Sequence, residues 1–135
     1  MSQQENLKLV KEIYDAVGQG DVAAILDRVH DDVDWSAEAS SDVAPWYGQR
    51  TGKTGVASFF RDLADSIEIT EFNPHSFAVG DDNVHLLVHW TFRSVNTGQQ
   101  ASMTMHHYWC IRDGKVEQFR GSEDTEQTAL VLTKR

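Results

Sequence analysis

The apolar residues in the first third of the chain recur at helical spacing. Between residues 7 and 17 they fall at intervals of three and four, which predicts an amphipathic helix ending at Gly18 and Gly20. Asp21 is a candidate N-cap for a second, shorter helix over about residues 22–29. The pattern therefore predicts that the chain begins with two helices joined by a tight turn.

One strand and a third helix are predicted next. Residues 33–39 alternate between apolar and polar types, which is typical of a half-buried strand. Residues 40–53 contain turn-forming proline and glycine and are predicted to be a loop. Thr54 is a candidate cap for the third helix. The predicted buried stripe of that helix consists of Val56, Phe59, Phe60 and Leu63.

The remainder of the chain is mostly strand-like. Strands are predicted at residues 67–79, 84–95, 102–112 and about 115–122, with turns between them. Pro74 interrupts the first of these runs, so that strand is expected at a sheet edge or at a bulge.

A short helix is predicted for the tail, over residues 125–132. Three helices with one inserted strand, followed by a four-strand meander, predict an α+β domain. In such a domain the helices pack on one face of a mostly antiparallel sheet. With 135 residues, the whole chain from 1 to 135 is expected to form a single domain with one core.

Composition and charge limit the classes of partner. The formal net charge of −9 argues against nucleic acid and anionic membranes, because both attract basic proteins. The polar N-terminus does not resemble a signal peptide, and no apolar run approaches the ~20 residues of a membrane span. A cytoplasmic protein with no membrane and no nucleic-acid partner is expected. The single cysteine, Cys110, allows no intrachain disulfide.

His107 is the most informative candidate for chemistry. It lies in an alternating strand whose same-face neighbours are apolar, whereas His106 points to the opposite face. A polar imidazole held among apolar side chains needs a polar partner. The apolar row that contains His107 consists of Met103, Met105, Trp109 and Ile111.

The order of elements and several motifs resemble the NTF2-like superfamily and, within it, the SnoaL-like proteins related to polyketide cyclases and ketosteroid isomerases. The main motifs are Asp32-Val33-Asp34-Trp35, Tyr47-Gly48-Gln49-Arg50-Thr51-Gly52 ahead of Phe59-Phe60, and the run from His107 to Val116 through Asp113-Gly114. The resemblance implies a cone-shaped fold, in which a curved sheet wraps a long helix and leaves an apolar pocket at its open end. It also implies a homodimer formed through the outer face of the sheet.

The resemblance also implies a catalytic pair. The family pattern places an acid-base histidine at His107 and an aspartate after the last strand at Asp124. A carboxylate beside the ring would fix its tautomer and raise its pKa. Three alternatives stay open: His107 is a purely structural buried histidine, Asp124 caps the tail helix, or Glu123 takes the place of Asp124. The base position of the ketosteroid isomerases matches Ala37, so their strict constellation is absent.

Aromatic residues and one methionine are the candidates for the pocket wall, although plain core packing would explain most of them equally well. The predicted pocket-lining residues are Tyr14, Trp35, Trp46, Tyr47, Phe60, Met105 and Trp109.

The expected partner is a small hydrophobic molecule. The leading hypothesis is a SnoaL-like enzyme that moves a proton beside the carbonyl group of an apolar compound, giving isomerisation, cyclisation or dehydration without a cofactor. A non-catalytic carrier of a hydrophobic ligand and a dimeric adaptor are the alternatives. His85, His89 and His106 are expected on the outer sheet face as dimer contacts. No metal site is expected there, because zinc sites need three or four suitably placed ligands.

Overall fold

The computed structural model describes residues 2–133 and contains four helices and six strands in that range. The elements in chain order are α1 (Gln3–Gln19), α2 (Val22–Leu26), β1 (Val29–Glu38), β2 (Gly48–Thr51), α3 (Gly52–Ser66), β3 (Ile67–Val79), β4 (Asn83–Ser94), β5 (Gln100–Arg112), β6 (Lys115–Ser122) and α4 (Thr125–Thr133).

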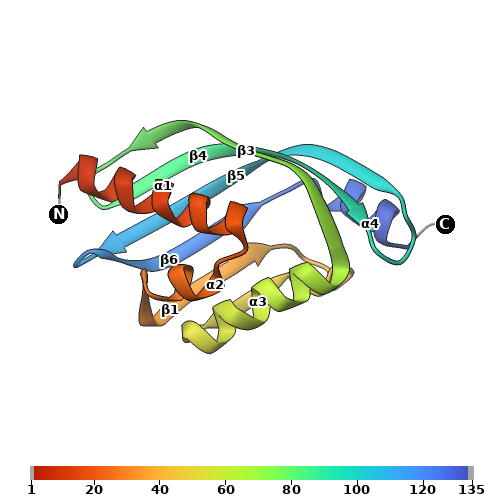
Figure 1. The fold of residues 1–135 in the computed structure, drawn as a ribbon, viewed down its shortest axis with the longest axis horizontal. Helices are drawn as coiled ribbons and strands as arrows, with labels where there is room; N and C mark the ends of the chain where they lie inside the picture. The colour runs from red at the N-terminus through yellow and green to blue at the C-terminus, as the bar shows by residue number, and fades with distance from the viewer. Residues whose placement is uncertain (1, 134–135) are drawn as a thin grey trace.

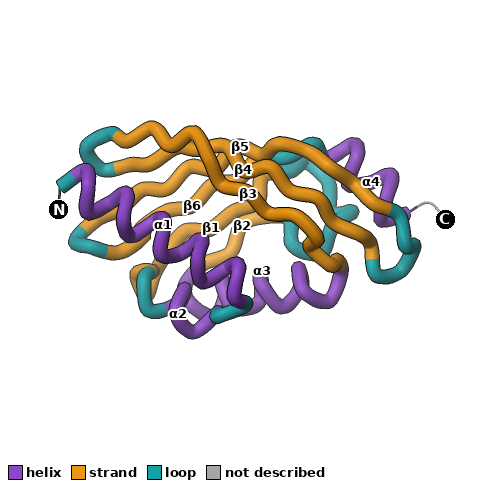
Figure 2. The backbone as a smooth tube through the Cα atoms, turned by 45° about the horizontal axis from the view of Figure 1, so that its top comes forward, coloured by secondary structure: helices purple, strands orange, loops and turns teal. Residues whose placement is uncertain are grey.

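The six strands form one curved sheet in the order β2-β1-β6-β5-β4-β3. Every neighbouring pair is antiparallel except β1 and β6, which run parallel. Helices α1, α2 and α3 lie along one face of this sheet, and α4 lies at the end of the sheet beside the turn between β4 and β5 (Figures 1 and 2). The predicted α+β class, with helices on one face of a mostly antiparallel sheet, is confirmed.

Local signals in the sequence account for the ends of the first helices. Ser2 and Glu5 form a capping box at the start of α1, in which each side chain bonds the backbone of the other. Gly20 ends α1 in the left-handed conformation at φ 68°, where a side chain would be strained. Asp21 caps α2 as predicted, by accepting a hydrogen bond from the backbone N–H of Ala24.

The structure differs from the predicted elements at several places. The second helix ends at Leu26, because Val29 already belongs to β1 and is buried there. The region predicted as a loop contains β2, a short strand whose residues do not alternate in hydrophobicity and therefore give no strand signal. Its last residue, Thr51, occupies the N-cap position of α3, in place of the predicted Thr54.

The edge position predicted from Pro74 is correct. Within the sheet, β3 pairs only with β4, and its register shifts between Ile69 and Glu71 and again between His75 and Ala78. A proline at an edge leaves no ladder hydrogen bond unmade, and bulges bend the strand. This bending helps the sheet to curve over the helices.

An aromatic cluster forms the core between the sheet and α3. The ring of Trp35 on β1 lies 4.3 Å from that of Phe119 on β6 and 5.5 Å from that of Trp109 on β5. Phe59 and Phe60 of α3 approach Trp35 from the helix side, at 5.6 and 5.8 Å. Such edge-on and tilted ring pairs contribute about 0.5–1.5 kcal/mol each beyond burial of their area. The cluster therefore gives the site a rigid floor.

Candidate functional site

A cavity lies between the inner face of the sheet and helices α1 and α3. It offers a volume of about 70 Å³ to the centres of water-sized molecules. Towards solvent it adjoins a groove between the end of α1 and β3, because Val17 and Phe72 border both spaces. A ligand larger than the enclosed part can therefore extend outwards between these two elements.

Six of the seven residues predicted to line a pocket lie on the wall of this cavity, namely Tyr14, Trp35, Trp46, Phe60, Met105 and Trp109. The seventh, Tyr47, is not on the wall and instead binds Glu123 from behind. All four tryptophans of the chain contribute to the wall, since Trp90 of β4 is the remaining one. The wall is apolar apart from a few side chains, chiefly Tyr14, His107 and Glu123.

His107 is bound by a hydrogen-bonded chain that starts at Trp109. The indole N–H of Trp109 donates to the hydroxyl oxygen of Tyr14 at 2.9 Å, and that hydroxyl lies 2.6 Å from Nδ1 of His107. The three residues come from α1 and β5, which are far apart in the sequence. Tyr14 therefore joins the long helix to the sheet directly beside the cavity.

The pattern of donors assigns the tautomer of His107. An indole N–H can only donate, so Tyr14 accepts from Trp109 and directs its own proton to His107. Nδ1 of His107 is then an acceptor, and the ring proton is assigned to Nε2. Nε2 faces Gly121 of β6, where the Cβ of any larger residue would stand only 3.4 Å away. The missing side chain at Gly121 leaves this N–H open to the cavity.

Burial keeps His107 uncharged. Removal of its ring from water, assisted by the nearby charge of His106, lowers the pKa of His107 to about 3. The expectation that a carboxylate raises this pKa is therefore wrong. Burial likewise raises the pKa of Tyr14 well above its ordinary value. We call the hydrogen-bonded chain of Trp109, Tyr14 and His107 the relay. At neutral pH it consists of three uncharged groups and ends in one available N–H donor, Nε2–H of His107.

Asp124 does not lie beside His107. Its carboxylate caps α4, accepting from the backbone N–H of Gln127 at 3.1 Å and from the side-chain amide of the same residue at 3.3 Å. Asp124 is also exposed. The predicted pairing of Asp124 with His107 is therefore corrected, and the alternative of a helix cap describes the residue.

Glu123 is the carboxylate that reaches the cavity. Its Oε2 accepts hydrogen bonds from the hydroxyls of Tyr47 at 2.9 Å and Thr128 at 2.6 Å. Its Oε1 has only a long contact of 3.4 Å with the indole N–H of Trp46. Burial raises the pKa of Glu123, while these three donors act in the opposite direction. Oε1 is thus the less engaged oxygen and the one best able to accept a proton.

Two further donors belong to residues of the cavity wall. The indole N–H groups of Trp35 and Trp90 are buried, and neither has an acceptor among the described residues. An unmade hydrogen bond of a buried donor costs about 1–3 kcal/mol. Both groups would gain from an acceptor oxygen brought close by a ligand.

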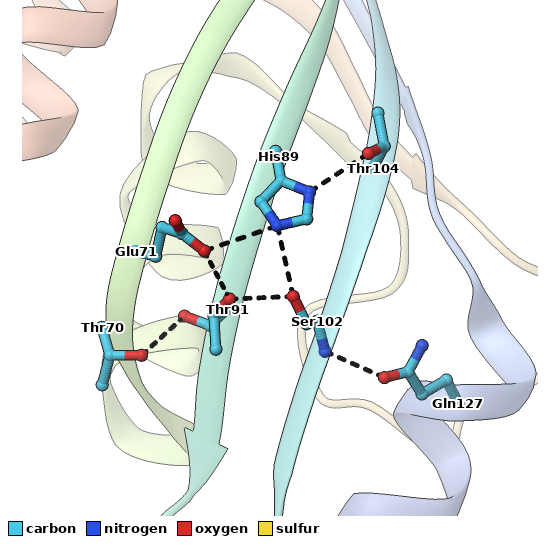
Figure 3. A network of polar contacts seen from close by, with 7 residues as sticks. All are labelled: Thr70, Glu71, His89, Thr91, Ser102, Thr104 and Gln127. Atoms are coloured by element: carbon cyan, nitrogen blue, oxygen red, sulfur yellow. Dashed lines mark hydrogen bonds and ion pairs between the residues drawn. The ribbon is translucent and has the colours of Figure 1, made fainter.

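His85, His89 and His106 lie on the opposite, outer face of the sheet, as predicted. Figure 3 shows His89 of β4 in a polar network with Glu71 of β3 and with Ser102 and Thr104 of β5. Glu71 and Ser102 both approach Nε2 of His89, at 3.4 and 3.2 Å, so no carboxylate orients the ring from its other nitrogen. This arrangement lacks the order of a nucleophilic triad. Within residues 2–133 no three His, Cys, Asp or Glu side chains converge as a metal site would require.

The fold agrees with comparisons to known proteins. The family model of the SnoaL-like domain matches residues 10–119. The chain belongs to the SnoaL-like domain family. No curated protein matches the sequence of this SnoaL-like chain.

Solved structures with the same fold cover nearly the whole SnoaL-like chain. An NTF2-like protein from Burkholderia xenovorans is 25% identical, with a TM-score of 0.88 and coverage of 98% of this chain and 99% of that one. An NTF2-like protein of unknown function from Burkholderia pseudomallei is 24% identical, with a TM-score of 0.89 and coverage of 99% of this chain and 100% of that one. TerC, co-crystallized with polyporic acid, is 21% identical, with a TM-score of 0.87 and coverage of 96% of this chain and 99% of that one.

In the described part of the chain, no helix is long and apolar enough to cross a membrane.

Proposed function

We propose that this SnoaL-like protein is an enzyme that binds a small, largely apolar carbonyl compound in the cavity and moves a proton at the carbon beside the carbonyl. The observation that carries the proposal is the presence of one poised acceptor and one poised donor in the same apolar space. Oε1 of Glu123 is the acceptor, and Nε2–H of His107 is the donor. The co-crystal of TerC with polyporic acid supports a small-molecule ligand for this fold.

The proposed step begins with proton abstraction by Glu123. Oε1 takes the proton from the carbon next to the carbonyl, and the electron pair of that C–H bond becomes part of an enolate. The negative charge then rests on the former carbonyl oxygen, where the Nε2–H of His107 stabilises it by a hydrogen bond. The raised pKa of Glu123 suits this role, because a base is most effective when its pKa lies nearer the working pH.

The fate of the enolate defines the reaction. Return of the proton from Glu123 to a different carbon gives an isomer. Attack of the enolate carbon on a second carbonyl group forms a C–C bond and closes a ring, and the proton passes to the new alkoxide oxygen. Departure of a hydroxyl group from the neighbouring carbon, protonated as it leaves, gives a dehydrated product. None of these three routes needs a cofactor.

His107 acts in this proposal as a donor and not as the base. With Nδ1 occupied by the Tyr14 hydroxyl, its only exchangeable ring proton is on Nε2. An uncharged imidazole is the weaker acid and the closer match to an enolate, so it stabilises the intermediate without protonating it prematurely. Tyr14 and Trp109 are positioning residues that hold this tautomer.

Hydrogen–deuterium exchange tests the proposal without knowledge of the natural substrate. The protein is incubated in D2O with uncharged bicyclic ketones, beginning with 2-tetralone, and loss of the α-proton signal is followed by NMR. We expect the wild type to accelerate exchange and Glu123→Gln to lower that rate about 10²–10⁴-fold, the usual contribution of a positioned base. Glutamine can still accept from Tyr47 and Thr128, so the fold should hold.

Asp124→Asn is the matched control, because it makes the same charge change one residue away on an exposed helix cap. It should exchange protons at the wild-type rate. Binding of the ketones without any acceleration by the wild type would instead identify a non-catalytic carrier. Equal rates in the wild type and Glu123→Gln would exclude Glu123 as the base.

A further inference from the structure

The only formal charge on the described part of the cavity wall is negative. Among the described residues that line it, Glu123 is the only one with a formal charge at neutral pH, and no lysine or arginine is present. The adjoining groove carries Asp15 and likewise lacks a basic residue. Glu71 also borders the groove, but its carboxylate is bonded to His89 and Thr91 on the outer face of the sheet. A ligand therefore passes the carboxylate of Asp15 in the groove and meets that of Glu123 in the cavity, and neither space offers it a positive charge.

The nearby arginines are engaged elsewhere. Arg50 pairs with Asp62 at 3.0 Å and donates to the hydroxyl of Ser58. Arg120 pairs with Asp34 at 2.7 Å on the outer side of the sheet, and neither arginine lines the cavity. The donors that hold Glu123 are two hydroxyls and an indole, all uncharged. The negative charge of Glu123 is thus stabilised by dipoles and remains unneutralised.

We propose that the cavity selects uncharged ligands and that Glu123 is the residue that rejects ligands carrying a carboxylate. The proposal rests on the assignment of this cavity as the binding site under the proposed function, and it narrows the substrate class to neutral carbonyl compounds. At an effective dielectric constant of about 20, two like unit charges about 6 Å apart repel enough to weaken binding about 100-fold. An apolar wall adds to this effect, because it offers an anion no replacement for its lost hydration.

A matched pair of probes separates charge from shape. We would measure the affinities of 2-acetonaphthone, a neutral ketone, and 2-naphthoate, which places a carboxylate on the same ring system, by isothermal titration calorimetry at pH 8. The wild type is expected to bind the ketone at least 10-fold, and up to about 100-fold, more tightly. Glu123→Gln should strengthen naphthoate binding and reduce the difference to about 3-fold or less.

Asp124→Asn again provides the control, because it removes one negative charge from the exposed cap beside Glu123. It should leave the preference for the ketone intact. Equal binding of both probes by the wild type, an unchanged preference in Glu123→Gln, or no binding of the ketone would each overturn the proposal. Because these readouts are affinities, a protein that prefers the ketone but never accelerates α-proton exchange would refute the proposed function while leaving the selectivity standing.

Discussion

Replacement of Tyr14 by phenylalanine removes one oxygen from the centre of the relay and keeps the ring. The ring contacts with Phe72 and Trp109 should persist. Two buried groups lose their partner at once: the N–H of Trp109, which donates at 2.9 Å, and Nδ1 of His107, which lies 2.6 Å from the hydroxyl. Each orphaned group costs about 1–3 kcal/mol. Because water in the cavity can partly solvate the ring of His107, we expect a total loss of about 2–4 kcal/mol.

Urea unfolding followed by tryptophan fluorescence measures this loss. With a typical slope of about 2 kcal/mol per molar urea for a small domain, the midpoint should fall by about 1–2 M without a change in slope. Tyr108→Phe is the control, because Tyr108 lies next to His107 on the opposite face and its hydroxyl is bonded to the thiol of Cys110, which forms only weak hydrogen bonds. A shift for Tyr14→Phe as small as that of the control would refute the relay.

Nitrogen NMR provides a second, independent readout of the same variant. In the wild type, Nδ1 of His107 should show the chemical shift of an unprotonated nitrogen and Nε2 that of a protonated one. In Tyr14→Phe both tautomers should be populated, since nothing fixes Nδ1 as an acceptor. A protonated Nδ1 in the wild type would contradict the assigned direction of the hydrogen bonds, whatever the stability result.

Three further predictions follow from the site. Gly121→Ala should weaken ketone binding about 10-fold or more, because its Cβ would stand 3.1 Å from Phe119 and 3.4 Å from Nε2 of His107. Calorimetry measures the affinity, and binding as tight as that of the wild type would contradict the placement of the ligand beside Gly121. The α-proton exchange rate should rise with pH and level off above the raised pKa of Glu123, because only the carboxylate accepts a proton; a rate that falls over this range would count against the base. The pKa of His107 is lowered to about 3 in the folded state, so its contribution to stability is present above its unfolded pKa of 6.5 and is lost as pH falls. Between pH 7 and 5, the free energy of unfolding of the wild type should therefore fall by about 2 kcal/mol more than that of His107→Leu, as measured by urea unfolding. Equal losses in the two proteins would contradict a neutral buried ring.

The sequence pattern predicted most of the fold because strong periodicity survives in tertiary structure. The predicted strand over residues 67–79 has the same limits as β3, and α1 ends at its glycine signal as predicted. The pattern missed β2 because an edge strand of four residues without apolar alternation looks the same as a loop. Such segments become strands only through the neighbour with which they pair.

The partner of His107 could not be predicted from the pattern. Tyr14 lies 93 positions away in the sequence, and only the packing of α1 across β5 brings its hydroxyl to the ring. For the carboxylate, a usable signal was present. Phe119, Gly121 and Glu123 alternate in β6 and the residue after it, so Glu123 continues the inward row, whereas Asp124 departs from it. The family pattern favoured the aspartate, but the geometry of the strand favours its neighbour.

The position of β6 in the sheet also determines when the domain can assemble. Of the six described strands, β6 emerges last during synthesis, yet it lies between β1 and β5. Until it arrives, the hairpin of β1 with β2 and the meander of β3 to β5 have no strand to join them. A ribosome-bound chain that stops short of residue 115 should therefore hold two separate half-sheets, each with an exposed apolar face that chaperones can bind. Because Glu123 directly follows β6, the insertion of β6 between β1 and β5 also brings the carboxylate of Glu123 into the cavity.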